Sequence, residues 1–588
     1  MNVGLLIIVA IPLFLLGYRY HARYIARAIG ENNARPTPAV ELCDGRDYCP
    51  SRSWIVFAHH FASIAGAGPI IGPVLALVYG VGPVWLWLVI GGIFFGAVHD
   101  YTALFVSIRE KGRSIAEVIR RIMGTEAYLV TVGFTLMMLI LVMAAFLRLS
   151  AVALTSVVPL AEIGLPDTQT LLRTFTDKDG VTWGQIGGIA STSVIIITIF
   201  APVLGFLHYK RNTSLLLVTV LAILACALGV LVGIFFPVRL KPEVWMLALS
   251  GYTLFASALP VWFLLQPRDF TNVFILYLGV ALLVVGGLSC GFQGQTLQQP
   301  LLSLDAARQQ NLPFLWPFLF ITVACGAISG FHALVAGGTV SKQITSEIAA
   351  RRVGYLGMLL ESLLAVGVLC AIGVGLSNAQ YLGLVYQAKP SNPVLAFGIG
   401  TGALLSKGLG IPVVAGTIFG ILMVEGFMAT TLDTAVRLCR LLWEELWKTL
   451  FGDAVRPLHH PWVNSGLSVG LMLLFAFTNA TNAIWPLFGT GNQLLAAITL
   501  IAVASWLRAS SRRTWFAVIP AVFMLVTTTW SLVVLGKSYL AKRQLLLGIS
   551  AAIMLVLTAM LLVIALRQCL KPRQASGGDS DGQPQDAV

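Results

Sequence analysis

Two adjacent histidines, His59 and His60, could carry a proton or bind a metal, and they lie in an apolar segment that is soon interrupted. The interruption consists of Gly66, Ala67, Gly68 and Pro69. A membrane helix that loses backbone hydrogen bonds is tolerated only where it is buried in protein or lines a cavity. Amides freed at the start of a half-helix bind carboxylates through their partial positive charge. The pattern therefore predicts the substrate or ion site of a transporter.

Other polar groups lie within or at the ends of apolar segments, where each ionisable group is a functional candidate. The candidates for ion coupling or gating are His59, His60, His99, Asp100, Asp269, His332, Thr339, Thr431 and Asp433. Each also has a structural interpretation. Buried histidines can bind backbone carbonyls, Arg268 can anchor a helix end beside Asp269, and Asp433 is spaced for an i,i+4 pair with Arg437.

A second interrupted segment follows Ser257 and contains Pro260 and Trp262 before Pro267. Proline removes a backbone donor and breaks the helix ladder. Ser257, Pro260 and Trp262 are therefore expected to form the wall opposite the Gly66–Pro69 break.

Of eight cysteines, Cys43 and Cys49 alone lie in a polar loop. With His59 or His60 they could bind a metal, although their six-residue spacing is not a zinc signature. The other six lie in or beside apolar spans and are expected to be core residues. No cofactor is expected.

The composition defines an all-α polytopic membrane protein. The 588 residues are 57% hydrophobic and 11% charged, whereas soluble domains carry about 25% charged residues. The net charge of +13 does not indicate nucleic-acid binding, because the basic residues cluster in short loops between apolar spans.

Apolar runs of about 20 residues predict fifteen membrane spans, and basic loops follow every odd-numbered span. The spans are 3–22, 54–80, 83–107, 127–158, 186–207, 214–236, 244–266, 270–290, 315–339, 353–375, 411–440, 463–478, 484–507, 514–535 and 544–566. The charge pattern predicts an outside N-terminus and a cytoplasmic C-terminus. Residues 393–410 are expected to form an outer surface or re-entrant helix, and residues 571–588 a disordered cytoplasmic tail.

Several strings together resemble the carbon starvation protein A family of inner-membrane peptide and pyruvate transporters. They are residues 44–48 (DGRDY), 59–61 (HHF), 64–69 (IAGAGP), 96–98 (GAV) with Asp100, 259–262 (LPVW), 267–269 (PRD), 324–327 (ACGA), 329–334 (SGFHAL), 430–435 (TTLDTA), 484–489 (IWPLFG) and 492–493 (NQ). The resemblance implies the leucine-transporter-like fold of the amino acid–polyamine–organocation superfamily, with two inverted five-helix repeats.

This resemblance implies a bacterial inner-membrane importer that works by alternating access. Residues 1–53 would hold one helix and a loop, 54–440 the ten-helix core, and 441–570 additional helices. The break at Gly66 would correspond to that near Pro260, because inverted repeats place interrupted helices in matching positions.

The resemblance also bears on the coupling ion. Ala336, Gly337, Gly338 and Thr339 stand where the family usually has Ser-Ser-Gly-Thr. Losing two hydroxyls weakens a sodium site made of oxygen ligands. Proton coupling is therefore expected, with His332, His59 or His60 as the titrating group, and sodium coupling is the alternative.

Three other classes stay open at this stage: a membrane haem or metal protein, an intramembrane enzyme and a channel. An enzyme is not expected, because no serine motif accompanies His99 and Asp100. The sequence does not choose between peptide and pyruvate, and it does not give the oligomeric state.

Overall fold

The computed structural model describes residues 1–44, 48–169, 172–211, 213–259, 263–310, 312–452 and 454–570. Within them the chain is almost entirely helical, as expected. The helices up to residue 258 are α1 (Gly4–Leu16), α2 (Ala22–Ile29), α3 (Pro38–Glu41), α4 (Ser53–Ile64), α5 (Gly68–Ala76), α6 (Val81–Gly91), α7 (Ala97–Arg109), α8 (Ile115–Met123), α9 (Thr125–Leu154), α10 (Gly187–Gly205), α11 (Leu215–Phe235) and α12 (Pro242–Ala258).

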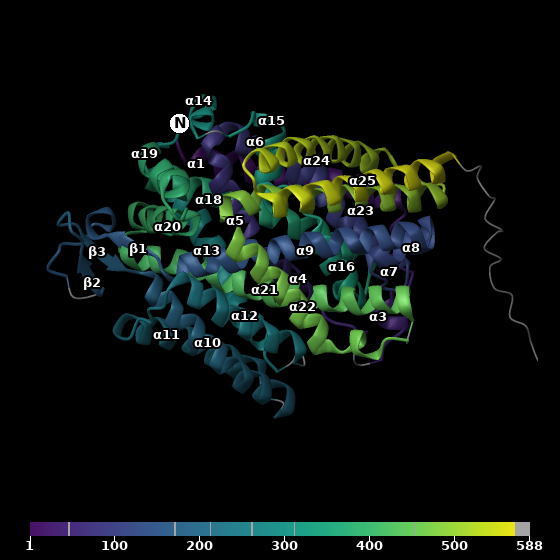
Figure 1. Ribbon diagram of the computed structural model, residues 1–588, viewed down its shortest axis with the longest axis horizontal. Helices are drawn as coiled ribbons and strands as arrows, with labels where there is room; N and C mark the ends of the chain where they lie inside the picture. The colour runs from purple at the N-terminus through teal and green to yellow at the C-terminus, as the bar shows by residue number, and fades with distance from the viewer. Residues whose placement is uncertain are drawn as a thin grey trace, which may run out of the picture.

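The remaining helices complete a bundle of long, roughly parallel rods (Figure 1). They are α13 (Leu265–Phe292), α14 (Leu304–Gln309), α15 (Leu315–Val323), α16 (Phe331–Gly338), α17 (Glu347–Ala350), α18 (Gly357–Gly375), α19 (Asn378–Leu382), α20 (Pro393–Leu409), α21 (Val413–Phe451), α22 (Pro461–Thr478), α23 (Thr481–Ala509), α24 (Trp515–Ala541) and α25 (Leu545–Leu570).

Thirteen helical segments of the described chain are long and apolar enough to span a membrane, or fourteen if the bent pair α4–α5 counts as one span. This confirms a multi-pass all-α membrane protein. The expected span that is missing from these fourteen is the seventh, 244–266, which corresponds to α12 with 17 residues. It packs against α9, α21 and α22.

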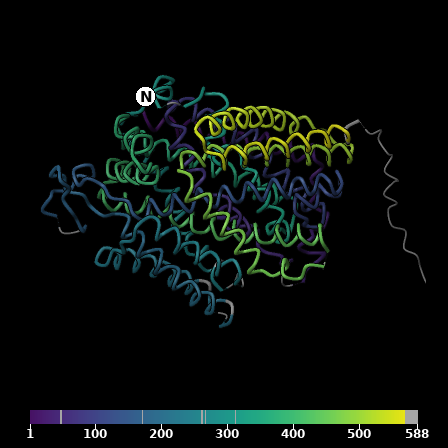
Figure 2. Tube along the Cα trace, in the orientation of Figure 1, coloured from purple at the N-terminus to yellow at the C-terminus, as the bar shows by residue number. Residues whose placement is uncertain are grey.

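The centre of the bundle is formed by helices that are apolar on every side. In α9, 24 of 30 residues are buried, as expected for a helix without a polar face. Helix pairs α10–α11 and α24–α25 lie along opposite edges of the bundle (Figures 1 and 2). One hydrophobic core extends from Val3 to Leu561, so the C-terminal helices belong to the same body as the others.

Of the two expectations for residues 393–410, a surface or a re-entrant helix, the burial of α20 rules out the surface helix. Of its 17 residues, 13 are buried, and it packs against α13, α18 and α21. The glycines of α20 allow this close packing, because Gly402 and Gly416 lie against each other at the contact between α20 and α21.

Four of the basic loops meet at one end of the bundle. Arg109 lies 2.6 Å from the Glu347 carboxylate and donates to the carbonyl of Gly30 at 2.9 Å. Arg351 lies 3.5 Å from Glu31, and the guanidinium of Arg512 packs against Gly30. The loops after the first, third, ninth and thirteenth expected spans therefore share one side of the membrane, as the charge pattern predicts.

A small antiparallel sheet lies at the other end (Figure 1). Strands β1 (Val157–Pro159), β2 (Thr174–Thr176) and β3 (Thr182–Gln185) pair in the order β1-β3-β2. The turn between β2 and β3 is held by the Asp177 carboxylate, which accepts hydrogen bonds from the Trp183 indole at 2.7 Å and the Val181 amide at 2.9 Å.

We expect acid to loosen this turn. The hydrogen bond from Trp183, followed by those from the backbone, lowers the pKa of Asp177. A lowered folded-state pKa contributes stability above the unfolded-state pKa and loses it as the pH falls through the folded-state pKa. Hydrogen exchange of residues 174–185 should therefore speed up at low pH. Asp177→Asn should remove most of this pH dependence, whereas Asp167→Asn in the same loop should leave it unchanged.

Candidate functional site

The first interrupted helix is the bent pair α4–α5, which turns by 43° between Ile64 and Gly68. The break is buried from Ala65 onward, and Pro69 lies in the first turn of α5. Among the described residues, the amides of Ala67 and Gly68 have no hydrogen-bond acceptor. These amides are unpaired donors at the start of a half-helix, a position that favours anions.

A second break faces the first. Helix α15 ends at Val323, and α16 begins only at Phe331. Ala324 has a positive φ of 46°, a conformation that costs a non-glycine residue roughly 1–3 kcal/mol and often occurs at functional sites. Gly68 packs against the sulfur of Cys325, and Gly72 against the carbonyl of Val323.

These contacts show that the two interrupted helices run antiparallel. Gly72, further along α5, contacts Val323, whereas Gly68, at the start of α5, contacts Cys325, which lies further along the other segment. The Gly66–Pro69 break therefore lies against the break between α15 and α16, whereas the expected counterpart at Pro260 lies outside the described residues. Glycine is required at Gly72, because the backbone of α15 occupies the position of any Cβ.

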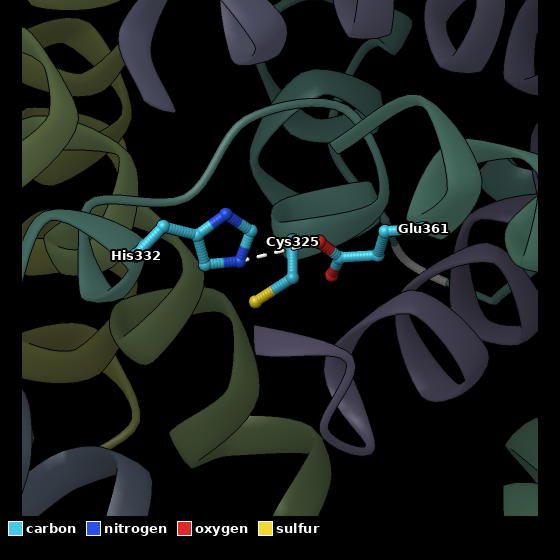
Figure 3. Close-up of side chains that lie close together, drawn as sticks. All are labelled: Cys325, His332 and Glu361. Atoms are coloured by element: carbon cyan, nitrogen blue, oxygen red, sulfur yellow. Dashed lines mark ion pairs between the residues drawn. The ribbon is translucent and has the colours of Figure 1, made fainter. Parts of the chain in front are cut away.

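Buried ionisable groups converge beside the second break. Asp100 of α7 accepts one hydrogen bond from His99 Nδ1 at 2.8 Å and another from His332 Nδ1 at 2.7 Å. The opposite ring nitrogen of His332 lies 3.3 Å from a carboxylate oxygen of Glu361 on α18. All four side chains are buried. Figure 3 shows His332, Glu361 and Cys325 pointing toward one another.

The paired histidines of α4 lie differently. His60 is buried against Gly357, one turn before Glu361, and neither of its ring nitrogens has a hydrogen-bond partner among the described residues. His59 is half-buried, and its backbone carbonyl accepts from Ser63 at 2.8 Å. The structure therefore brings His60, but not His59, beside the cluster of Asp100 and His332.

Asn492 of α23 forms hydrogen bonds with three residues of the second break. Its side chain accepts a hydrogen bond from the Phe331 amide at 3.0 Å and donates to Ser329 at 3.1 Å and to the Cys325 sulfur at 3.4 Å. Helix α23 was expected to lie outside the transport core, yet it supplies this residue.

We expect Asn492→Ala to lower the free energy of unfolding by about 1–3 kcal/mol, because it leaves buried donors and acceptors without partners. Denaturant unfolding in detergent micelles would measure the loss. Asn482→Ala, at an exposed position of the same helix, is the matched control and should have little effect. Equal stability of the two variants would contradict this role of Asn492.

A second buried charged cluster lies where α12 and α13 meet α21. Arg268 is 2% exposed and lies 2.6 Å from Asp433, which is fully buried. Tyr252 donates to Asp433 at 2.8 Å and accepts from Arg268. Asp269 is 3.9 Å from Arg268. Arg268 is thus a buried partner of Asp433 and not a surface anchor.

The expected pairing of Asp433 with Arg437 is wrong, because the Arg437 guanidinium donates to the carbonyl of Leu259. The Ser257 hydroxyl donates to the carbonyl of Leu254 at 3.0 Å and lies 2.9 Å from the hydroxyl of Ser465, so this side chain is directed toward α22. Pro260 and Trp262 lie outside the described residues, as do residues 45–47 and the tail 571–588.

The two threonines expected at the site lie in different places. Thr431 of α21 packs against Gly66, so α21 connects the first break to the cluster around Asp433. Thr339 is exposed near the end of α16, and its hydroxyl donates to Val335 at 3.2 Å. Thr339 therefore lies away from the two breaks.

The residues able to hold a metal also differ from expectation. Cys43 is exposed and Cys49 half-buried, and no group of three potential ligands includes either among the described residues. Among the described residues, the group of potential metal ligands is instead Cys325, His332 and Glu361. Glu361 was missed, although a single carboxylate inside the apolar run 357–375 is itself a signal of function.

Two antiparallel interrupted helices that meet at buried polar groups inside a multi-pass bundle are characteristic of membrane transporters. The sequence matches the family of carbon starvation protein CstA over residues 2–389 and 376–531. The chain belongs to the CstA family.

Curated relatives agree with this assignment. The chain is 31% identical to a peptide transporter CstA of Campylobacter jejuni, covering 89% of this chain and 79% of the relative. It is 30% identical to a peptide transporter CstA of Bacillus subtilis, covering 97% of each. It is 30% identical to the pyruvate/proton symporter BtsT of Escherichia coli, covering 90% of this chain and 81% of the relative. The family and these names point to a transporter and not to an enzyme.

Proposed function

We propose that the protein is a proton-coupled secondary transporter that imports a small carboxylate-bearing nutrient, a short peptide or pyruvate, by alternating access. The observation that carries this proposal is the meeting of two antiparallel helix breaks, at Gly66–Pro69 and at 324–330, in the buried centre of the bundle. Interrupted helices of this kind form substrate sites at the membrane midplane, around which the two sides open alternately. The relatives named as peptide transporters and as a pyruvate/proton symporter support the same class of substrate.

The substrate carboxylate would bind the amides of Ala67 and Gly68. These donors have no acceptor among the described residues, and they lie at the positive end of α5. The hydroxyl of Thr431 lies against Gly66 and would face the bound anion. Both substrate classes carry a carboxylate, so this contact serves either one.

We assign proton coupling to Asp433, in place of the histidines that the sequence suggested. Arg268 and Tyr252 contact its carboxylate, while Asp269 and Arg437 lie nearby. Breaking a buried ion pair by removing one charge is costly, so protonation of Asp433 would weaken its hold on Arg268. Because Thr431 is two residues away on α21 and touches Gly66, such a change would reach the substrate site.

The basic end of the bundle would face the cytoplasm, which puts the N-terminus outside. The protein would then lie in a bacterial inner membrane. Helices α4–α5, α6–α7, α12 and α13 would rock against the remainder of the bundle, the expected motion of inverted-repeat transporters.

The test is uptake into proteoliposomes under an imposed pH gradient without sodium. Labelled pyruvate and a labelled dipeptide should be offered in parallel, and the substrate should accumulate until an uncoupler collapses the gradient. Asp433→Asn should abolish accumulation while exchange of labelled for unlabelled substrate continues. Asp305→Asn, on the exposed helix α14, is the matched control.

Two outcomes would overturn parts of the proposal. Uptake that requires sodium and ignores the uncoupler would exclude proton coupling. Full accumulation by Asp433→Asn would exclude Asp433 as the coupling residue while leaving the transporter class intact.

A further inference from the structure

We propose that Cys325, His332 and Glu361 bind a single divalent transition-metal ion, zinc, where α16 and α18 meet the break after α15. The sulfur, a ring nitrogen and a carboxylate oxygen of these residues lie within 4.8 Å of one another, and all three side chains are buried (Figure 3). This site goes beyond the transport function, which assigns no role to it.

The donor set and its spacing suit zinc. Thiolate, imidazole and carboxylate are its usual protein ligands. A tetrahedral ion with nitrogen and oxygen ligands at about 2.0 Å holds these two atoms about 3.3 Å apart. The ring nitrogen Nε2 of His332 and the oxygen Oε2 of Glu361 are 3.3 Å apart. They are therefore already placed as two corners of a zinc tetrahedron.

The hydrogen bond from His332 to Asp100 orients the imidazole ring toward Glu361. An N–H at Nδ1 donates to Asp100 at 2.7 Å, which leaves the lone pair of Nε2 facing the Glu361 carboxylate. Two acceptors at this distance repel each other unless a proton or a metal ion lies between them. A carboxylate behind a ligating histidine fixes the tautomer and raises the basicity of the ring.

Several buried polar atoms in and beside this cluster have no hydrogen-bond partner among the described residues. Among the described residues, neither carboxylate oxygen of Glu361 nor Nε2 of His332 has a hydrogen-bond partner. Both ring nitrogens of His60 also lack one, so His60, beside Gly357, is the candidate fourth ligand. Asn492 donates to the Cys325 sulfur at 3.4 Å, a contact that stabilises a thiolate. Buried polar groups are otherwise almost always paired.

The experiment measures zinc itself, with no transport assay. The purified full chain, stripped with a chelator in detergent micelles, should bind one zinc per chain in equilibrium dialysis. Cys325→Ser and Glu361→Gln should each weaken binding by at least about tenfold, because ligands contribute no less than their supporting residues. Cys370→Ser is the matched control, since this buried cysteine lies on α18 away from the cluster.

Cobalt gives a second readout that identifies the sulfur ligand. Cobalt added to the stripped protein should show a thiolate charge-transfer band, lost in Cys325→Ser and retained in Cys370→Ser. Gel filtration of each variant confirms that it is folded. No stoichiometric zinc, or equal zinc binding by all variants, would overturn the site and leave a proton between His332 and Glu361. Neither result depends on whether the uptake test succeeds.

Discussion

Arg268→Gln should lower the free energy of unfolding by about 3–5 kcal/mol, because it leaves the fully buried Asp433 carboxylate without its cationic partner. Arg268 lies 2.6 Å from Asp433 and is itself 2% exposed, so water cannot replace the lost charge. Denaturant titration in detergent micelles would measure the change. Substrate uptake should be lost as well, since the ends of α12 and α13 are held to α21 through this pair.

A double-mutant cycle separates the ion pair from other effects of the substitution. Combining Arg268→Gln with Asp433→Asn removes both charges and should recover part of the stability, because the penalty comes from the unpaired charge. Arg148→Gln is the matched control. Arg148 is a half-buried arginine whose guanidinium donates to the carbonyl of Ala476 at 2.8 Å. Strictly additive losses in the cycle would show that Arg268 and Asp433 do not interact.

Gly72→Ala should separate the two interrupted helices and abolish uptake. A Cβ at this position would overlap the backbone carbonyl of Val323, and backbone cannot rotate away as a flexible side chain can. Overpacking of this kind typically costs about 1–3 kcal/mol and sometimes more, and a backbone clash belongs at the upper end. The measurements are the unfolding free energy in micelles and initial uptake rates in proteoliposomes.

The matched control for this prediction is Gly133→Ala in α9, where an added Cβ meets no atom within 4 Å. Alanine is also the better helix former, so this variant should be at least as stable as the parent chain. Normal uptake by Gly72→Ala would mean that the close approach of α5 and α15 is not needed for transport.

The membrane class, most of the spans and the first helix break are all predictable from the amino-acid sequence alone. These depend on local properties: the hydrophobicity of about 20 consecutive residues, and the loss of backbone donors at proline and glycine. The basic loops that converge around Arg109 and Gly30 were also predictable, because topology follows charge counts in short loops.

The tertiary structure decided which polar residues meet. Asp100 and His332 are 232 positions apart, and no periodicity connects them. Asp433 was expected to pair with Arg437 one helical turn away, but Arg268 reaches it from another helix. An i,i+4 side-chain pair stabilises a helix by only about 0.2–0.5 kcal/mol, which a buried contact between two helices easily exceeds.

The partner of the first break was likewise decided by packing. Two later segments, near Pro260 and near Cys325, carry the proline or glycine residues that interrupt a helix. The inverted-repeat symmetry that the family resemblance implies favoured the first of them. The second lies beside the first break, because Gly72 leaves room for the backbone of α15 and Gly68 leaves room for the side chain of Cys325. Local composition thus determines where a helix breaks, and the packing of the whole bundle determines which broken helices and which charges form one site.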